Sequence, residues 1–159
     1  STVQVLASEN GRESHRLWAW AHTLVALDAL EAGDAEDAEG ARRHLLSALE
    51  WPESLGQGRP YQPEERLVRY LLGVAERRLG NDAAAREQFE AVVAASPATG
   101  APEASELTVA SRLDLLAVPA LEALGRAADP RSLSAAPASL FEDLEGRILR
   151  RALDLEGSR

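Results

Sequence analysis

Three similar stretches of this chain each end in a glycine, and they recur at nearly regular intervals. The stretches are Leu30–Gly33, Arg77–Gly80 and Glu122–Gly125, and their glycines are 47 and 45 residues apart. A glycine just past a helix end is common because that position often takes a positive φ. Self-similarity at a fixed period indicates stacked supersecondary units. The spacing therefore predicts repeated helix pairs, with each glycine following the first helix of its pair.

The residues around Gly80 predict one complete pair over about 63–97. The apolar positions of its first helix follow the i, i+3, i+4, i+7 spacing of one helix face: Leu67, Tyr70, Leu71 and Val74. Those of the second helix are Ala85, Phe89, Val92 and Val93. Ser96 and Pro97 then end the pattern, since a proline disfavours a helical residue before it.

The flanking segments predict two more pairs, over about 12–50 and 103–156. The first helix, about 12–32, is apolar on more than one face, which predicts packing against two neighbours. In the third pair we expect a bend or break near Val118, because the interior Pro119 costs about 3 kcal/mol in a helix. Residues 1–11 are expected to form a flexible N-terminal tail. The prediction is an all-α domain over 12–159 with about six main helices in antiparallel pairs.

Charge and composition exclude several classes of function. The net charge is −9, with 26 acidic against 17 basic residues, which disfavours nucleic acid and anionic membranes as partners. The chain has no cysteine, so it has no disulfide framework and no thiolate metal site. No apolar run is long enough to span a bilayer and no signal peptide pattern is visible, so we expect a cytoplasmic protein. It begins at Ser1 without Met, and we expect it to be processed or part of a larger protein.

The clearest pair resembles a tetratricopeptide repeat (TPR). The resemblance is carried by the types and spacing of six positions: Leu72, Gly73, Gly80, Ala85, Phe89 and Pro97. It is specific over 67–97 and weaker elsewhere, because the first unit has about three extra residues after Gly33 and the third has a longer insertion after Gly125. The resemblance implies a right-handed α-solenoid that acts as a protein–protein interaction scaffold, without enzymatic activity, cofactor or metal.

In this family the first helix of each pair lines a concave groove, which implies a binding site for a protein or peptide. The arginines would meet carboxylates of the partner through bidentate hydrogen bonds; the alternative is that they are ordinary solvated surface. We call these positions the predicted groove: Trp20, Thr23, Leu27 and Glu31, then Tyr70, Val74, Arg77 and Arg78, and finally Arg112, Leu115 and Glu122.

A narrower resemblance concerns the connector from Glu50 to Pro60. This segment is similar to one in large bacterial proteins that carry a galactose-mutarotase-like sugar-binding domain followed by TPR repeats. It implies an alternative function, an accessory or dimerisation region of a carbohydrate-active enzyme. The partner would then be a neighbouring domain of the same chain or a second copy in a homodimer. An exposed apolar face on the first or last helix would favour this alternative, because it would indicate a missing neighbour.

The histidines and tryptophans are the remaining candidates for a site. His15, His22 and His44 would have to converge with Asp28 or Glu31 to hold a metal, and the i, i+4 pairing of helical ligands is absent. We therefore expect histidines that are satisfied internally or exposed. An aromatic sugar platform would use Trp18, Trp20 and Trp51. Because Trp18 and Trp20 point in different directions on a helix, core packing is the better interpretation for at least one of them.

Overall fold

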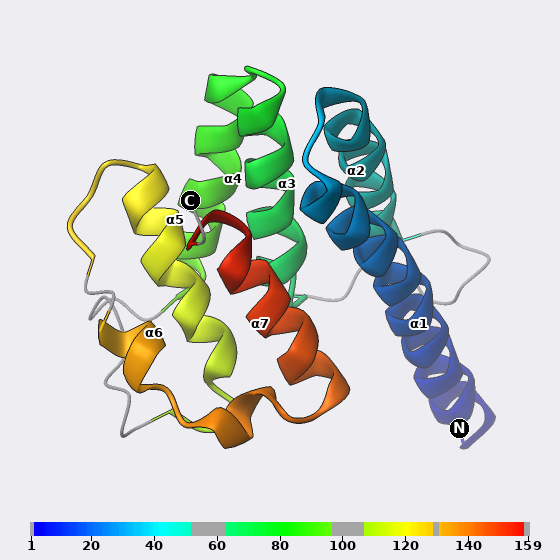
Figure 1. Ribbon diagram of the computed structural model, residues 1–159. Helices are drawn as coiled ribbons and strands as arrows, with labels where there is room; N and C mark the ends of the chain where they lie inside the picture. The colour runs from blue at the N-terminus through cyan, green and yellow to red at the C-terminus, as the bar shows by residue number, and fades with distance from the viewer. Residues whose placement is uncertain (1, 52–62, 97–106, 129–130, 158–159) are drawn as a thin grey trace.

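The computed structural model describes residues 2–51, 63–96, 107–128 and 131–157, and within these ranges the chain is helical without a strand (Figure 1). Most of the connector from Glu50 to Pro60, and Pro97, lie outside the described residues. The first four helices are α1 (Thr2–Ala32), α2 (Ala35–Ala48), α3 (Arg66–Arg78) and α4 (Asp82–Ala94). The later elements are the 3-10 helix η3 (Arg112–Leu116), α5 (Ala117–Ala123), α6 (Arg131–Ala135), the 3-10 helix η4 (Ala138–Phe141) and α7 (Leu144–Gly157).

The first four helices confirm the expected all-α fold with neighbouring helices packed in pairs. Helix α1 packs against α2 and α3 against α4, while α2 also contacts α3 and α4 contacts α5 (Figure 1). The three repeated glycines all have positive φ, at 94° for Gly33, 79° for Gly80 and 72° for Gly125. The periodic glycine therefore does mark the end of the first helix in each unit.

Two of these glycines close their helices with the same hydrogen bonds. Gly80 N donates to the carbonyl of Arg77 at 3.1 Å, and the next amide, of Asn81, donates to the carbonyl of Glu76 at 2.9 Å. The amides of Gly125 and Arg126 repeat this pattern after α5. Such a pair of bonds satisfies carbonyls that the helix end leaves open, and it needs the left-handed backbone that glycine adopts without strain.

Gly73 lets α3 and α4 approach closely, which gives a first testable prediction. A Cβ at this position would lie 2.7 Å from the Phe89 ring, whereas a Cβ at Gly40 in α2 would meet nothing within 4 Å. We expect Gly73→Ala to destabilise the protein by about 1 kcal/mol or more, because overpacking of about 1–3 kcal/mol exceeds the gain in helix propensity. Gly40→Ala should stabilise it by about 0.5–1 kcal/mol. Urea unfolding of both variants checks the opposite signs, and equal effects would contradict this account of the packing.

The N-terminal segment differs from the expected tail, because α1 already begins at Thr2. Residues 2–11 contain no proline, and each residue added to an existing helix contributes one backbone hydrogen bond once nucleation has been achieved. The end of α1 at Ala32 agrees with the sequence analysis. Helix α2 starts at Ala35, where the side chain of Asp34 accepts a hydrogen bond from the amide of Asp37 at 2.8 Å.

The expected irregularity near Val118 is present, and it takes the form of a change of helix type. The 3-10 helix η3 ends at Leu116 and α5 begins at Ala117, so Pro119 lies in the first turn of α5. There the missing N–H of proline removes no intrahelical hydrogen bond. The proline is accommodated because a new helix starts just before it.

The C-terminal third is not a simple third hairpin over 103–156. Its described part contains η3, α5, α6, η4 and α7, and α7 packs against η4, α1 and α3. Figure 1 shows α7 lying across the layer of the preceding helices, between α5 and α1. The last helix thus folds back over the first helices of both N-terminal pairs.

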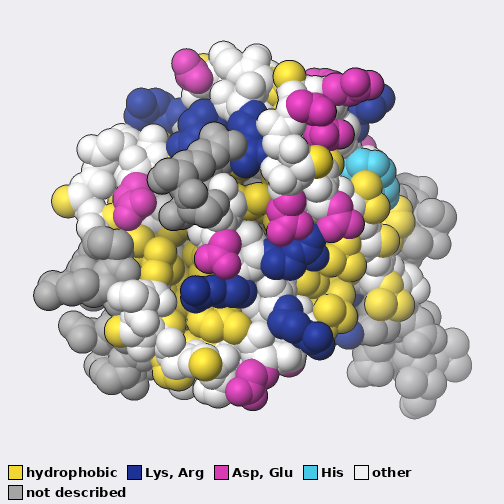
Figure 2. Space-filling view, viewed as in Figure 1, with side chains coloured by type: hydrophobic (Ala, Val, Ile, Leu, Met, Phe, Trp, Pro, Cys, Tyr) yellow, Lys and Arg dark blue, Asp and Glu magenta, His cyan; other side chains and the backbone are white. Residues whose placement is uncertain are grey.

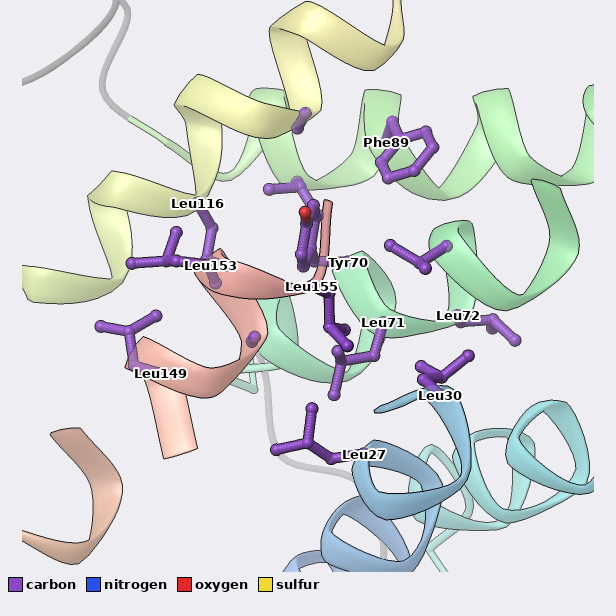
Figure 3. Packing of buried hydrophobic residues seen from close by; sticks show 14 of the residues in the cluster. Leu27, Leu30, Tyr70, Leu71, Leu72, Phe89, Leu116, Leu149, Leu153 and Leu155 are labelled. Atoms are coloured by element: carbon purple, nitrogen blue, oxygen red, sulfur yellow. The ribbon is translucent and has the colours of Figure 1, made fainter. Parts of the chain in front are cut away.

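The core lies where α7 meets α1 and α3. In Figure 3, Leu155 of α7 lies beside Tyr70 and Leu71 of α3, and Leu153 lies near Leu116 of η3. The fully or almost fully buried members from these three helices include Leu27, Leu30, Tyr70, Leu71, Leu149, Leu153 and Leu155. One continuous cluster therefore links the N-terminal pairs to the last helix.

Candidate interaction surfaces

The predicted groove is covered by the chain itself. Five of its apolar and hydroxyl positions are buried, namely Thr23, Leu27, Tyr70, Val74 and Leu115. Trp20 is half-buried and packs against the core, whereas Glu31 and Glu122 are exposed. The buried side chains of α1 and α3 join the cluster to which α7 contributes, so they belong to the core of this protein.

Arg151 of α7 binds the acidic edge of α1. Its Nη2 donates to Asp28 Oδ1 at 2.5 Å, and its Nε donates to Glu31 Oε2 at 3.2 Å. The pKa of the Arg151 guanidinium is raised above its usual value, mainly by the hydrogen bond to Glu31 and to a smaller extent by the one to Asp28. Figure 2 shows basic and acidic side chains close together over the middle of this face, with hydrophobic side chains on both sides. Glu31, expected to face a partner, is thus engaged by the chain's own last helix.

Arg112 makes the bidentate carboxylate contact that was expected with a partner, but the carboxylate belongs to this chain. Its Nη1 and Nη2 donate to Asp143 Oδ1 at 2.6 Å and Oδ2 at 3.0 Å, and Nη1 also donates to the carbonyl of Leu140 at 3.0 Å. Nη2 further reaches Glu145 at 3.2 Å. The guanidinium is buried, and its hydrogen bond lowers the pKa of Asp143. This arginine therefore holds the start of α7 against η3.

The other two arginines of the predicted groove also have contacts within the chain. The guanidinium of Arg77 lies 5.4 Å from the centre of the Phe89 ring, a cation–π contact between α3 and α4. Arg78 donates a hydrogen bond to the carbonyl of Leu30 at the end of α1. Both side chains are only partly exposed. They join neighbouring helices.

A row of aromatic and imidazole rings lies along one edge of the α1–α2 hairpin. His15 stacks on Trp51 with ring centroids 3.3 Å apart, and its Nε2 lies 2.7 Å from the carbonyl oxygen of Glu50. Trp18 meets His22 edge-on at 4.8 Å. Burial and the neighbouring His44 lower the pKa of His22. Trp18, Trp51 and two histidines thus pack on one another, which leaves the Trp51 face stacked on His15 unavailable as a sugar platform.

The outward face of α1 exposes apolar side chains that sequence reasoning did not assign to a site. Leu17 is 58% exposed and Val25 is 48% exposed, and the exposed Ala21 lies between them. Residues four apart lie on the same face of a helix, so these three form one line, which we call the outer stripe. In Figure 2 hydrophobic side chains also gather on the α1 side of the view. The signal in the sequence was the apolar character of this helix on more than one face.

The C-terminal end of the outer stripe is acidic. At its C-terminal end, Asp28 lies seven residues beyond Ala21 and therefore near the same line. The carboxylate of Asp28 accepts a hydrogen bond from α7, yet its side chain remains 72% exposed. The exposed Asp34 and Glu36 follow where α1 turns into α2. At the other end of the stripe the sequence has the acidic Glu13, the uncharged Ser14 and the basic Arg16, so no single charge prevails there. A complementary surface would therefore be apolar, with basic side chains at the end that meets these acids.

Comparison of the chain with protein-family models, curated proteins and solved structures found no match. In the part of the chain that the structure describes, no helix combines the length and apolarity needed to cross a bilayer. The same residues contain no group of three or more histidine, aspartate or glutamate side chains that could hold a metal ion. The surfaces themselves are thus the basis for a functional proposal.

Proposed function

We propose that this chain is a TPR-like protein–protein interaction module that docks through the outer stripe of α1. The observation that carries the proposal is the contrast between the two faces of that helix. The face towards the predicted groove is covered by α7, while the opposite face leaves Leu17 and Val25 in water. Exposed Leu and Val side chains in one line on a helix indicate the contact surface of a further neighbour, in addition to α2, α3 and α7.

The charge pattern indicates the chemistry of that neighbour. A second copy packed antiparallel about Ala21 would bring Asp28 opposite Ser14, where the nearby acidic Glu13 and basic Arg16 offset each other, and a parallel copy would place the two acidic ends side by side. The net charge of −9 adds repulsion between two copies. The partner is therefore a different protein surface, or a neighbouring domain of the same polypeptide, with an apolar face that ends in Arg or Lys.

Two designed helical peptides test this docking mode. Both carry a leucine stripe, which ends in Arg residues in one peptide and in Glu residues in the other. We expect the Arg-ended peptide to bind the full chain and the Glu-ended peptide to bind at least fivefold more weakly, with a smaller difference at high salt. The Leu17→Glu/Val25→Glu variant should lose at least tenfold in affinity for the first peptide, because two charges enter the apolar contact. Fluorescence anisotropy at low and at physiological salt measures both effects.

Val109→Glu is the matched control, because Val109 is also 58% exposed but lies outside α1. This variant should bind the Arg-ended peptide as the unchanged chain does. If the Leu17→Glu/Val25→Glu variant bound the Arg-ended peptide with the affinity of the unchanged chain, docking through the outer stripe would be contradicted. Light scattering after size exclusion distinguishes the homodimer: we expect a monomer, and a concentration-dependent dimer lost in the double variant would replace this proposal with self-association.

The accessory region of a carbohydrate-active enzyme is the second candidate, and the exposed outer stripe favours it as well. In that case the neighbour is a domain of the same polypeptide, and the TPR-like units serve to hold it. The helix pairs, the positive-φ glycines and the close approach at Gly73 support a right-handed TPR-like stack for α1 to α5. A cytoplasmic location remains part of the proposal.

A further inference from the structure

Two histidines from different helices meet on the α1–α2 hairpin. Nδ1 of His22 on α1 lies 2.9 Å from Nδ1 of His44 on α2, and the ring centroids are 5.1 Å apart. Both rings are partly exposed. Between two neutral imidazoles this distance is a hydrogen bond in which one Nδ1 donates and the other accepts. The pair is thus both preorganised and open to solvent.

The surroundings of the pair hold it in place. The two helices are joined by the short turn at Gly33 and Asp34, and they pack along their length. The rings of Trp18 and His22 meet nearly at right angles, with their centroids 4.8 Å apart. A site built on two packed helices keeps its geometry better than one on loops.

We propose that His22 and His44 form a two-imidazole binding site for a divalent transition-metal ion, with water in the remaining positions. Metal–imidazole bonds of about 2.0–2.1 Å at a right angle place the two nitrogens about 2.9 Å apart, which is their separation here. A tetrahedral angle with the same bonds would need about 3.4 Å. The spacing therefore fits adjacent positions of the tetragonal geometry that Cu²⁺ and Ni²⁺ adopt, and Zn²⁺ requires a small widening.

Binding needs only a change of tautomer and a rotation of the rings. The ring that donates from Nδ1 would carry its proton on Nε2 instead, so both Nδ1 lone pairs become free for the metal. No cysteine and no third histidine or carboxylate joins the pair among the described residues. Hard ions such as Mg²⁺ and Ca²⁺ prefer oxygen ligands and should bind poorly.

The third histidine of the chain provides a matched control. His15 lies on the same helix, but its Nε2 contacts the carbonyl of Glu50 and its ring is stacked on Trp51. It is also buried, whereas the other two are partly exposed. Replacing His15 should leave the chelating pair intact.

Thermal unfolding of the untagged full chain tests the site with CuCl₂, NiCl₂, ZnCl₂ and MgCl₂. Metal that binds only the folded protein raises Tm, by about 5 °C or more at a hundredfold excess over Kd. We expect the affinity order Cu²⁺ above Ni²⁺ and Zn²⁺, with no shift from Mg²⁺ and reversal by EDTA. His22→Gln and His44→Gln should each abolish the shift, and His15→Gln should retain it.

Electron paramagnetic resonance of Cu²⁺ bound to the unchanged chain is independent of any variant. We expect one site whose nitrogen couplings correspond to two imidazoles. No Tm shift at millimolar metal, a shift that survives His44→Gln, or a Cu²⁺ signal with fewer than two imidazole nitrogens would each overturn the proposal. Because the outer stripe takes no part in metal binding, these outcomes are separate from the peptide test above.

Discussion

Leu149→Ala is expected to destabilise the protein by about 2–5 kcal/mol. Leu149 is fully buried in the core, and Figure 3 shows it near Leu153 of the same helix. Truncation to alanine loses the transfer free energy of the removed atoms and leaves a cavity between elements far apart in sequence. The free energy of unfolding from urea denaturation measures the loss, with far-UV circular dichroism as the probe.

The matched control is Leu144→Ala at the beginning of the same helix. Leu144 is 50% exposed, so the same chemical change should alter stability by less than about 0.5 kcal/mol. A small effect at Leu149 would mean that α7 is only loosely attached. The predicted groove would then be open for part of the time, and a peptide-binding function there would regain support.

Arg112→Ala is expected to cost about 2–4 kcal/mol, because a buried side chain loses several charge-assisted hydrogen bonds at once. The carbonyl of Leu140 loses a donor, and Asp143 loses its bidentate partner. The control is Arg126→Ala, which removes an ion pair with Glu90 in which the side chains are 48% and 41% exposed. Exposed pairs contribute about 0–1 kcal/mol. Equal losses in the two variants would contradict the structural role of Arg112.

The dependence of the free energy of unfolding on pH, at acid pH, provides a second test of the role of Arg112. Its hydrogen bond keeps the pKa of Asp143 below the usual value for a carboxyl group. A carboxyl whose pKa is lower in the folded state stabilises the protein above the unfolded-state pKa of about 3.9, and this stabilisation is lost as the pH falls below it. The unchanged chain should therefore lose more stability than Arg112→Ala between about pH 4 and pH 2.

The sequence predicted the structure best at positions where a residue type has a single physical role, such as glycine at a positive φ. Gly33, Gly80 and Gly125 were predicted to follow helices, and their positive φ values confirm this. The apolar spacing of α3 and α4 predicted part of the buried set: Tyr70, Leu71, Val74, Ala85, Phe89 and Val92 are buried, whereas Leu67 and Val93 are only partly buried. The burial of Leu72, Ala75 and Glu76 was not predicted. Local rules of backbone conformation and helix periodicity act over a few residues, so a single sequence carries them directly.

The position of α7 could not be obtained in this way. Its apolar stripe shows that one face is buried, but that face fits the outside of a third repeat as well as it fits α1 and α3. The choice depends on contacts such as Arg151 with Glu31, which are 120 residues apart. Burial of Arg112 was missed for the same reason, because Asp143 is distant in sequence and nothing local marks the pair. The meeting of His22 and His44 likewise requires the register of two helices.

The contact between the last helix and the first also affects how this chain folds. Repeat proteins whose units touch only their neighbours can nucleate anywhere and add units one by one. Here the buried face of α1 and α3 is completed only when residues 144–157 arrive, so the fold should form and melt as one cooperative unit, with slower kinetics because its key contacts are long-range. During synthesis that apolar face stays exposed until residues 144–157 have left the ribosome, and exposed apolar surface of this kind is what chaperones bind.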